Sequence, residues 1–143
     1  MATDFATYDP ALVSVVFGPK ILTGFAQDSI VTVERLNDTW TDQVGARGYV
    51  SRARNADRRG TITVVFDQTS QSNDDLSAIM LQDELNSTGV YPILVRDASG
   101  TSVASGASAW LTRPATIEMG NGILGRQWVF RVAVLAMAVG GNS

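Results

Sequence analysis

The sequence predicts a mostly β protein, a single-domain barrel or sandwich with one flanking α-helix over about residues 72–86. Three observations predict this class. Residues 61–67 alternate apolar and polar side chains, as a strand with one covered face does. Further β-branched or alternating runs are separated by turn residues such as Gly18-Pro19. One segment combines a capping serine, Ser72, with acidic residues in the following turn and ends near Gly89, as a helix does.

The strands account for most of the remaining chain. We expect them over residues 12–17, 21–25, 29–36, 61–67, 90–96 and 102–112. Pro92 predicts an edge position or a bulge, because proline cannot donate to a sheet. Residues 126–139 also alternate, and a single strand of that length would extend roughly 45 Å at ~3.3 Å per residue. This segment is therefore expected to bend through a barrel or to project beyond it, and to form a hairpin with residues 116–119 through a turn at 120–125.

The predicted helix carries two apolar stripes. The first consists of Leu76, Ile79 and Met80. The second lies roughly opposite and consists of Ala78, Leu81 and Leu85. One stripe is enough to pack the helix on a sheet. Contact with another subunit explains the second stripe most simply, although a deep slot between two sheets would also cover it.

Two segments are expected to lack regular structure. Residues 1–10 are polar and are predicted to form an N-terminal arm. Residues 37–59 are predicted to form a long loop, with room for a short strand at Tyr49-Val50, and they hold five arginines and three aspartates. Loops of this length are uncommon in compact domains and are often functional. A solvated loop is one interpretation, but the mixed charge favours a segment that pairs with a neighbour.

The composition favours an assembly part over a solitary protein. The 143 residues fit one domain of ordinary size. Charged residues make up 17% of the chain, against roughly 25% in an average soluble domain. Apolar residues make up 45%. A small domain has much surface to cover, so this surface is expected to be apolar and to be buried against copies or partners.

The same composition argues against catalysis. The chain has no cysteine and no histidine, so a thiol nucleophile, the usual general base and the usual zinc ligands are missing. The string Gly120-x-Gly122-x-x-Gly125 lacks the strand and helix that a dinucleotide site requires. Paired acids at 74–75 and 83–84 are explained by capping and solvent exposure on the helix. We therefore predict no catalytic residue, no cofactor and no metal.

Charge and hydropathy also limit the partners. The net charge of −3 argues against a protein that grips nucleic acid by its phosphates. Apolar stretches fall short of the ~20 residues that span a membrane. The N-terminus lacks a basic segment followed by an apolar one, so we expect synthesis and folding in the cytoplasm.

Three motifs in order resemble a known family. The first is Asp28-Ser-Ile-Val-Thr-Val-Glu-Arg35. The second is Gly45-Ala-Arg-Gly48-Tyr-Val-Ser-Arg52, followed by Asp57 and by Gly60-Thr-Ile-Thr-Val. The third is Gln68-x-Ser70-x-Ser72-Asn73-x-x-Leu76, at the start of the helix. Over about residues 8–139 the chain resembles the tail tube proteins of contractile-tailed phages, which are related in fold to the tube proteins of pyocin-like particles and type VI secretion.

The resemblance implies a barrel or sandwich whose copies, six to a ring, stack into a tube inside a contractile sheath. The implied partners are further copies, the sheath and tape-measure proteins, and the baseplate and tail-terminator proteins. DNA would pass through the lumen without specific binding. The protein would be assembled in the host cytoplasm and would reside in the virion tail.

On this interpretation, the two unexplained surface features become contacts between copies. The second helix stripe (Ala78, Leu81 and Leu85) is the candidate for the lateral contact between subunits of a ring. The 37–59 segment is the candidate for the contact between rings, through Arg47, Arg52, Arg54 and Asp57.

Two alternatives stay open. The chain could be another ring component of the tail or baseplate, or of a phage-tail-like injection particle. It could instead be a monomeric β-barrel that binds a small apolar ligand, which requires an internal pocket.

Overall fold

A computed structural model describes residues 7–26 and 31–141. The elements within these ranges, in chain order, are η1 (Pro10–Leu12), β1 (Val13–Phe17), β2 (Lys20–Leu22), β3 (Val31–Arg35), β4 (Trp40–Val44), β5 (Val50–Arg54), β6 (Gly60–Asp67), α1 (Gln71–Asn86), β7 (Tyr91–Asp97), β8 (Val103–Leu111), β9 (Gly125–Val132) and β10 (Ala136–Ala138). The predicted class, mostly β with one α-helix, is confirmed.

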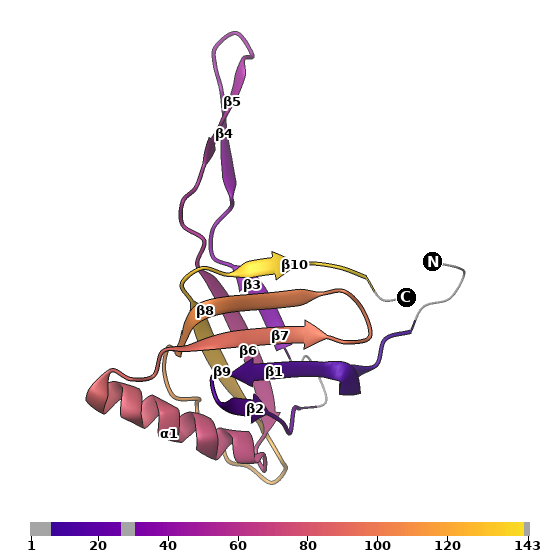
Figure 1. Cartoon of the computed structure of the whole chain (residues 1–143), viewed down its shortest axis with the longest axis vertical. Helices are drawn as coiled ribbons and strands as arrows, with labels where there is room; N and C mark the ends of the chain where they lie inside the picture. Colours follow the sequence, from indigo (N-terminus) through magenta and orange to yellow (C-terminus); the bar gives the residue numbers. More distant parts are fainter. Residues whose placement is uncertain (1–6, 27–30, 142–143) are drawn as a thin grey trace.

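The strands form two crossed layers (Figure 1). One hydrogen-bonded order, β2-β1-β7-β8-β9-β6-β3, runs through both layers, and β10 pairs with β8 beside the end of β9. All of these pairings are antiparallel. In Figure 1, β1, β2, β7, β8 and β10 run across the front, and β9, β6 and β3 cross steeply behind them. The helix α1 lies across one end of this sandwich.

The core lies between the layers and follows the alternation in the sequence. Ile62, Val64 and Phe66 of β6 are fully buried, as predicted, because the alternate residues of this strand face outward. Phe17 of β1 and Phe130 of β9 join the two layers, with ring centroids 4.8 Å apart. Such aromatic pairs contribute packing energy beyond the area that they bury.

The helix is confirmed close to its predicted bounds of about 72–86, but its capping residues differ from the prediction. The N-cap is Ser70, whose side chain accepts a hydrogen bond from the backbone N–H of Ser72. Ser72 is instead buried, and its hydroxyl exchanges hydrogen bonds with the backbone of Thr23. The helix ends at Ser87 in the left-handed conformation, with φ of 57°, and not at Gly89. The sequence offers capping serines two residues apart. Both hydroxyls donate to the carbonyl oxygen of Thr23, but it is the oxygen of Ser70 that accepts the N–H of Ser72 at the start of the helix.

The strand pairing tests three further predictions, which concern Pro92, the 126–139 segment and the expected hairpin at 116–139. Pro92 produces a bulge in β7, where the register with β8 shifts between Tyr91 and Ile93. The 126–139 segment bends and is divided into β9 and β10. The predicted hairpin between residues 116–119 and 126–139 is wrong, because residues 112–124 form an irregular connection and β9 pairs with β6 and β8.

The bend between β9 and β10 is packed on a glycine. Leu135 is fully buried, and its backbone N–H donates to the carbonyl oxygen of Arg58, with N and O 2.9 Å apart. Its side chain occupies the space where a Cβ of Gly60 would lie. The start of β6 can pass this close to the bend only because Gly60 has no side chain.

We expect Gly60→Ala to lower the free energy of unfolding by about 1–3 kcal/mol, the usual cost of overpacking a core. The new methyl group would displace Leu135 and strain the bend. Urea denaturation measures the change. Gly122→Ala is the matched control, because nothing lies within 4 Å of the position of its new Cβ. Equal stability of the two variants would contradict this account of the bend.

Candidate assembly surfaces

Residues 37–59 form a β-hairpin and not the irregular loop that the sequence predicted. The strands β4 and β5 pair from Trp40 opposite Arg54 to Val44 opposite Val50, in a two-stranded sheet of their own. The turn between them is closed by a hydrogen bond from the N–H of Gly45 to the carbonyl oxygen of Tyr49, over 2.8 Å. The hairpin projects from one end of the sandwich (Figure 1). All ten of its strand residues are exposed.

The hairpin has two chemically different faces. Residues directly opposite in an antiparallel pair share a face. One face therefore carries the large and charged side chains, namely Trp40, Asp42, Val44, Val50, Arg52 and Arg54. The other carries small or uncharged ones, namely Thr41, Gln43, Ser51 and Ala53. The hairpin thus presents one broad face that combines apolar and cationic groups.

The predicted contact arginines lie at different heights on this hairpin. Arg47 is in the exposed turn at its tip. Arg52 lies over the ring of Trp40, with its guanidinium carbon 3.8 Å from the ring centroid. Arg54 lies beside them, opposite Trp40. The cation–π contact stiffens the middle of the hairpin. Arg52 and Arg54 outnumber Asp42 on its large face, so that face carries a positive charge.

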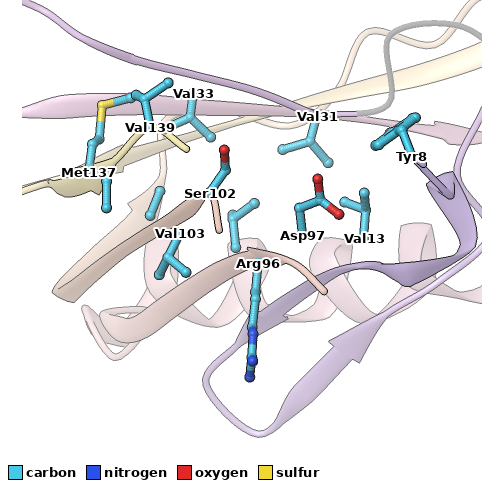
Figure 2. A pocket seen from close by; sticks show the side chains of 13 residues that line it. Tyr8, Val13, Val31, Val33, Arg96, Asp97, Ser102, Val103, Met137 and Val139 are labelled. Atoms are coloured by element: carbon cyan, nitrogen blue, oxygen red, sulfur yellow. The ribbon is translucent and has the colours of Figure 1, made fainter. Parts of the chain in front are cut away.

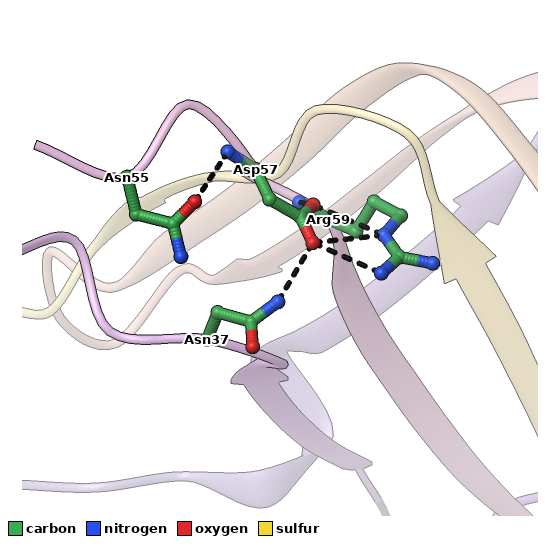
Figure 3. A network of polar contacts seen from close by, with 4 residues as sticks. All are labelled: Asn37, Asn55, Asp57 and Arg59. Carbon is green, nitrogen blue, oxygen red and sulfur yellow. Dashed lines mark hydrogen bonds and ion pairs between the residues drawn. The ribbon is translucent and has the colours of Figure 1, made fainter.

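Asp57, the fourth predicted contact residue, lies at the base of the hairpin and bonds within its own chain (Figure 3). Its carboxylate accepts hydrogen bonds from the guanidinium of Arg59, with the closest oxygen 2.9 Å from Nη2, and from the side-chain amide of Asn37 at 2.7 Å. The hydrogen bonds and charge of Arg59 lower the pKa of Asp57 to about 2. Asp57 therefore holds the two legs of the hairpin together.

A second set of contacts attaches the base to the sandwich. The guanidinium of Arg35 donates to the carbonyl oxygen of Leu135 at 2.8 Å and to the hydroxyl of Thr39 at 3.3 Å. The N–H of Leu36 donates to the carbonyl oxygen of Arg59 over 3.1 Å. The direction of the hairpin is thus fixed by polar contacts at its base, since its strands touch no core.

One apolar stripe of the helix α1 faces the core and the other faces outward, as the periodicity of the sequence suggested. Leu76 is fully buried, and Ile79 and Met80 pack against the core. Trp128 of β9 supports this contact by donating its indole N–H to the side chain of Asn73 over 3.0 Å. The second stripe faces outward, with Leu81 57% and Leu85 72% exposed and Ala78 exposed beside them. The isolated protomer thus leaves this stripe uncovered.

Sequence reasoning missed a third exposed feature, the connection 112–124. Its apolar side chains Ile117, Met119 and Ile123 are mostly exposed. Ile117 lines a shallow pocket together with Asp74 and Ser77 of α1, so the connection adjoins the helix. The apolar residues at 117, 119 and 123 are the available signal in the sequence, but residues 117 and 119 also fit the hairpin strand predicted over residues 116–119. The exposed stripe of α1 and this connection together form one surface, here named the helix–loop surface.

An apolar cavity of about 200 Å³ lies where β3 faces the ends of β7, β8 and β10. Val31 and Val33 lie on one side of it, Val13 and Val103 lie across from them, and Met137 lies at one end (Figure 2). Pockets for drug-sized ligands usually measure roughly 300–1,000 Å³. The cavity is smaller than these, so it gives little support to the ligand-binding alternative.

Two further findings concern the described residues. They contain no group of three or more acidic, histidine or cysteine side chains placed to hold a metal ion. Within the same ranges, the helices are too short or too polar to span a bilayer.

The fold and its exposed surfaces define a β-sandwich structural protein. Comparison with known proteins identifies its kind, since the chain belongs to the family of the bacteriophage PhiTE tail tube protein, whose family model matches residues 11–140. The family is structural and not enzymatic, and the chain is a component of the phage tail.

One relative supports this assignment, and two solved structures share the fold. The structural protein ORF10 of Pseudomonas phage KPP10 is 35% identical over 150 residues, which cover 99% of this chain and 87% of the relative. The tube-terminating cap of the anti-feeding prophage has the same fold, with a TM-score of 0.61, 11% identity and coverage of 96% of this chain and 94% of the cap. The sheath/tube terminator of the extracellular contractile injection system PVC also has this fold, with a TM-score of 0.60 and 14% identity. The match covers 96% of this chain and 100% of the terminator.

The network around Asp57 makes stability depend on pH. Because the pKa of Asp57 is lowered from 3.8 to about 2 in the folded state, its contribution to stability is present above pH 3.8 and is lost as the pH falls towards 2. We expect the stability difference between the wild type and Asp57→Asn to narrow over this interval in urea denaturation. In an NMR titration, Arg59→Gln should raise the pKa of Asp57 towards 3.8. An unchanged pKa in this variant would contradict the role of Arg59.

Proposed function

We propose that the chain is the tail tube protomer, and that its copies form rings which stack into the conduit for DNA within a contractile sheath. The observation that carries the proposal is the projecting hairpin, whose strand residues are all exposed in a chain of the tail tube family. A two-stranded hairpin is at best marginally stable alone in water. A partner in the assembled state supplies the missing contacts.

The arrangement of the surfaces suits a closed ring and a stack. The hairpin and the helix–loop surface are different, so a contact that uses one of them on each copy is heterologous. Heterologous contacts generate closed rings when the rotation closes and open filaments when it does not, so a stack of rings needs two different contacts. Arg47, Arg52 and Arg54 are the proposed contact residues between rings, and Asp57 supports them from the base. Ala78, Leu81 and Leu85 belong to a contact between subunits.

A second candidate function is a tube terminator, a single ring that caps the stack. The two solved structures with the same fold are described as a tube-terminating cap and as a sheath/tube terminator. A terminator must bind the tube on one side and must not continue it on the other. The two functions therefore differ in whether the purified chain stacks beyond one ring.

Negative-stain microscopy of the purified chain, over a range of concentrations, tests the proposal. A tube protomer is expected to give hollow tubes of variable length, because each ring exposes the surfaces that bind the next. Isolated rings that never stack would favour the terminator instead. A strictly monomeric species at high concentration would contradict both functions.

We expect Leu81→Asp and Leu85→Asp to prevent assembly and to leave the protomer folded. A carboxylate buried in a subunit contact is costly without a partner, whereas both positions are exposed in the protomer. Sedimentation measures assembly, and circular dichroism measures folding. Asn86→Asp, at an exposed position outside the stripe on the same helix, is the control and should assemble normally. Normal assembly of both leucine variants would remove this stripe from the contact.

A further inference from the structure

The hairpin and the helix–loop surface lie at opposite ends of the protomer. Figure 1 places the longest axis of the molecule vertically, with the β4–β5 hairpin at one end of it and α1 at the other. When identical copies are arranged head to tail along this axis, the hairpin of one copy meets the helix end of the next. The two surfaces can therefore meet without any change in the shape of the protomer.

The two ends carry opposite charge. Residues 40–54 contain three arginines and one aspartate. Residues 71–86 contain three aspartates and one glutamate, with no lysine or arginine. The adjoining connection adds Arg113 and Glu118, and Arg126 lines the pocket beside Asp74, so the helix end keeps a smaller net negative charge. Complementary charge of this kind orients two surfaces and rejects the wrong pairing, because like charges brought together are costly. It favours hairpin against helix, and it opposes hairpin against hairpin or helix against helix.

Two of the four acids on the helix have roles in their own chain. Asp75 lies 3.7 Å from the ammonium of Lys20, and Asp83 accepts the N–H of Gly89 at 3.1 Å. Asp74 and Glu84 are exposed and form no ion pair with any described residue. At 100° per residue, Asp74 lies within the exposed leucine stripe, and Glu84 lies on its flank.

The apolar groups of the two surfaces also correspond. Val44 and Val50 lie opposite each other near the tip of the hairpin and are 66% and 61% exposed. Leu81 and Leu85 supply the exposed apolar groups of the helix, and Ile117 extends them onto the connection. A strand of five residues is roughly 17 Å long and a helix of sixteen roughly 24 Å. Because the hairpin projects along the long axis and α1 lies across it (Figure 1), the hairpin of one copy crosses the stripe of the next in a head-to-tail arrangement.

We propose that the β4–β5 hairpin of one copy docks on the helix–loop surface of a copy in the adjacent ring, with Arg47 and Arg54 facing Asp74 and Glu84. This inference rests on the proposed function and names the surface that receives the hairpin. It assigns the stripe of Ala78, Leu81 and Leu85 to the contact between rings, in place of the lateral contact expected from the sequence. Each copy uses its hairpin once and receives one hairpin.

Charge reversal with rescue tests the pairing. The hairpin variant is Arg47→Glu/Arg54→Glu, the helix variant is Asp74→Arg/Glu84→Arg, and the third variant combines all four changes. Each double variant should raise the concentration at which half of the chain is assembled by about tenfold or more, because like charges then face each other. The combined variant restores opposite charges and should assemble near the wild-type concentration. Sedimentation gives the assembled fraction, and negative-stain microscopy distinguishes stacks from rings.

Controls separate folding and nonspecific charge from the contact. Circular dichroism and a thermal melt establish that each variant is folded. Glu34→Arg, at an exposed position of β3 outside both surfaces, should assemble as the wild type does. If Asp74→Arg weakens the start of the helix, the same charge-reversal test can use only Arg47→Glu, Glu84→Arg and the variant that combines these two changes.

The outcomes distinguish this inference from the proposed function. Loss of assembly in both double variants and its recovery in the combined variant would support the docking. Loss without recovery, or loss in only one double variant or in neither, would overturn the docking and leave the tube protomer in place. A wild-type chain that never assembles would overturn both.

Discussion

The bend at Leu135 is the constraint on which the rest of the structure depends. Its side chain fills the space left by Gly60. Its N–H donates a hydrogen bond to the carbonyl oxygen of Arg58, and its carbonyl oxygen accepts a hydrogen bond from the guanidinium of Arg35. One residue thus joins the turn from β9 to β10, the start of β6 and the end of β3. Because β3 leads into the hairpin and β6 leads out of it, the same bend sets where the hairpin leaves the sandwich.

The hairpin itself is held differently from the core. Burial of apolar area stabilises the sandwich, whereas the hairpin buries none of its strand residues and depends on its ladder, on the contact of Arg52 with Trp40 and on the network of Asp57. These contacts are individually weak in water. They suffice to orient the hairpin, and they leave its large face free to bind.

The sequence predicted those elements whose side chains pack on a core. Alternation identified β6 and its inward residues, and helical periodicity separated the buried Leu76 from the exposed Leu81. It did not predict the β4–β5 hairpin, because no buried face imposes an apolar alternation on residues that remain in solvent. Trp40, Asp42 and Val44 share a face only because of the strand pairing. The turn chemistry of Gly45 and Gly48 was present, and Gly48 adopts a φ of 83°.

The candidate assembly surfaces were predicted only in part, because the sequence pattern reports contact with the core and not contacts between exposed side chains. The sequence indicated which helix residues would remain outside the core, and the structure confirms that they are exposed. It could not show that Asp57 bonds to Arg59 and Asn37, since that depends on how the legs of the hairpin meet. The connection 112–124 was missed because its apolar residues suggested a strand paired with β9. In the structure both edges of β9 are occupied, one by β6 and the other by β8.

The placement of the hairpin and α1 at opposite ends gives the protomer a direction. Any column of such copies, all pointing the same way, exposes positively charged hairpins at one terminus and negatively charged helices at the other. Growth at the two termini then proceeds by different chemical events, and a protein that stops elongation needs to match only one of them. Polarity of the whole filament is therefore already encoded in the placement of a hairpin within a single chain.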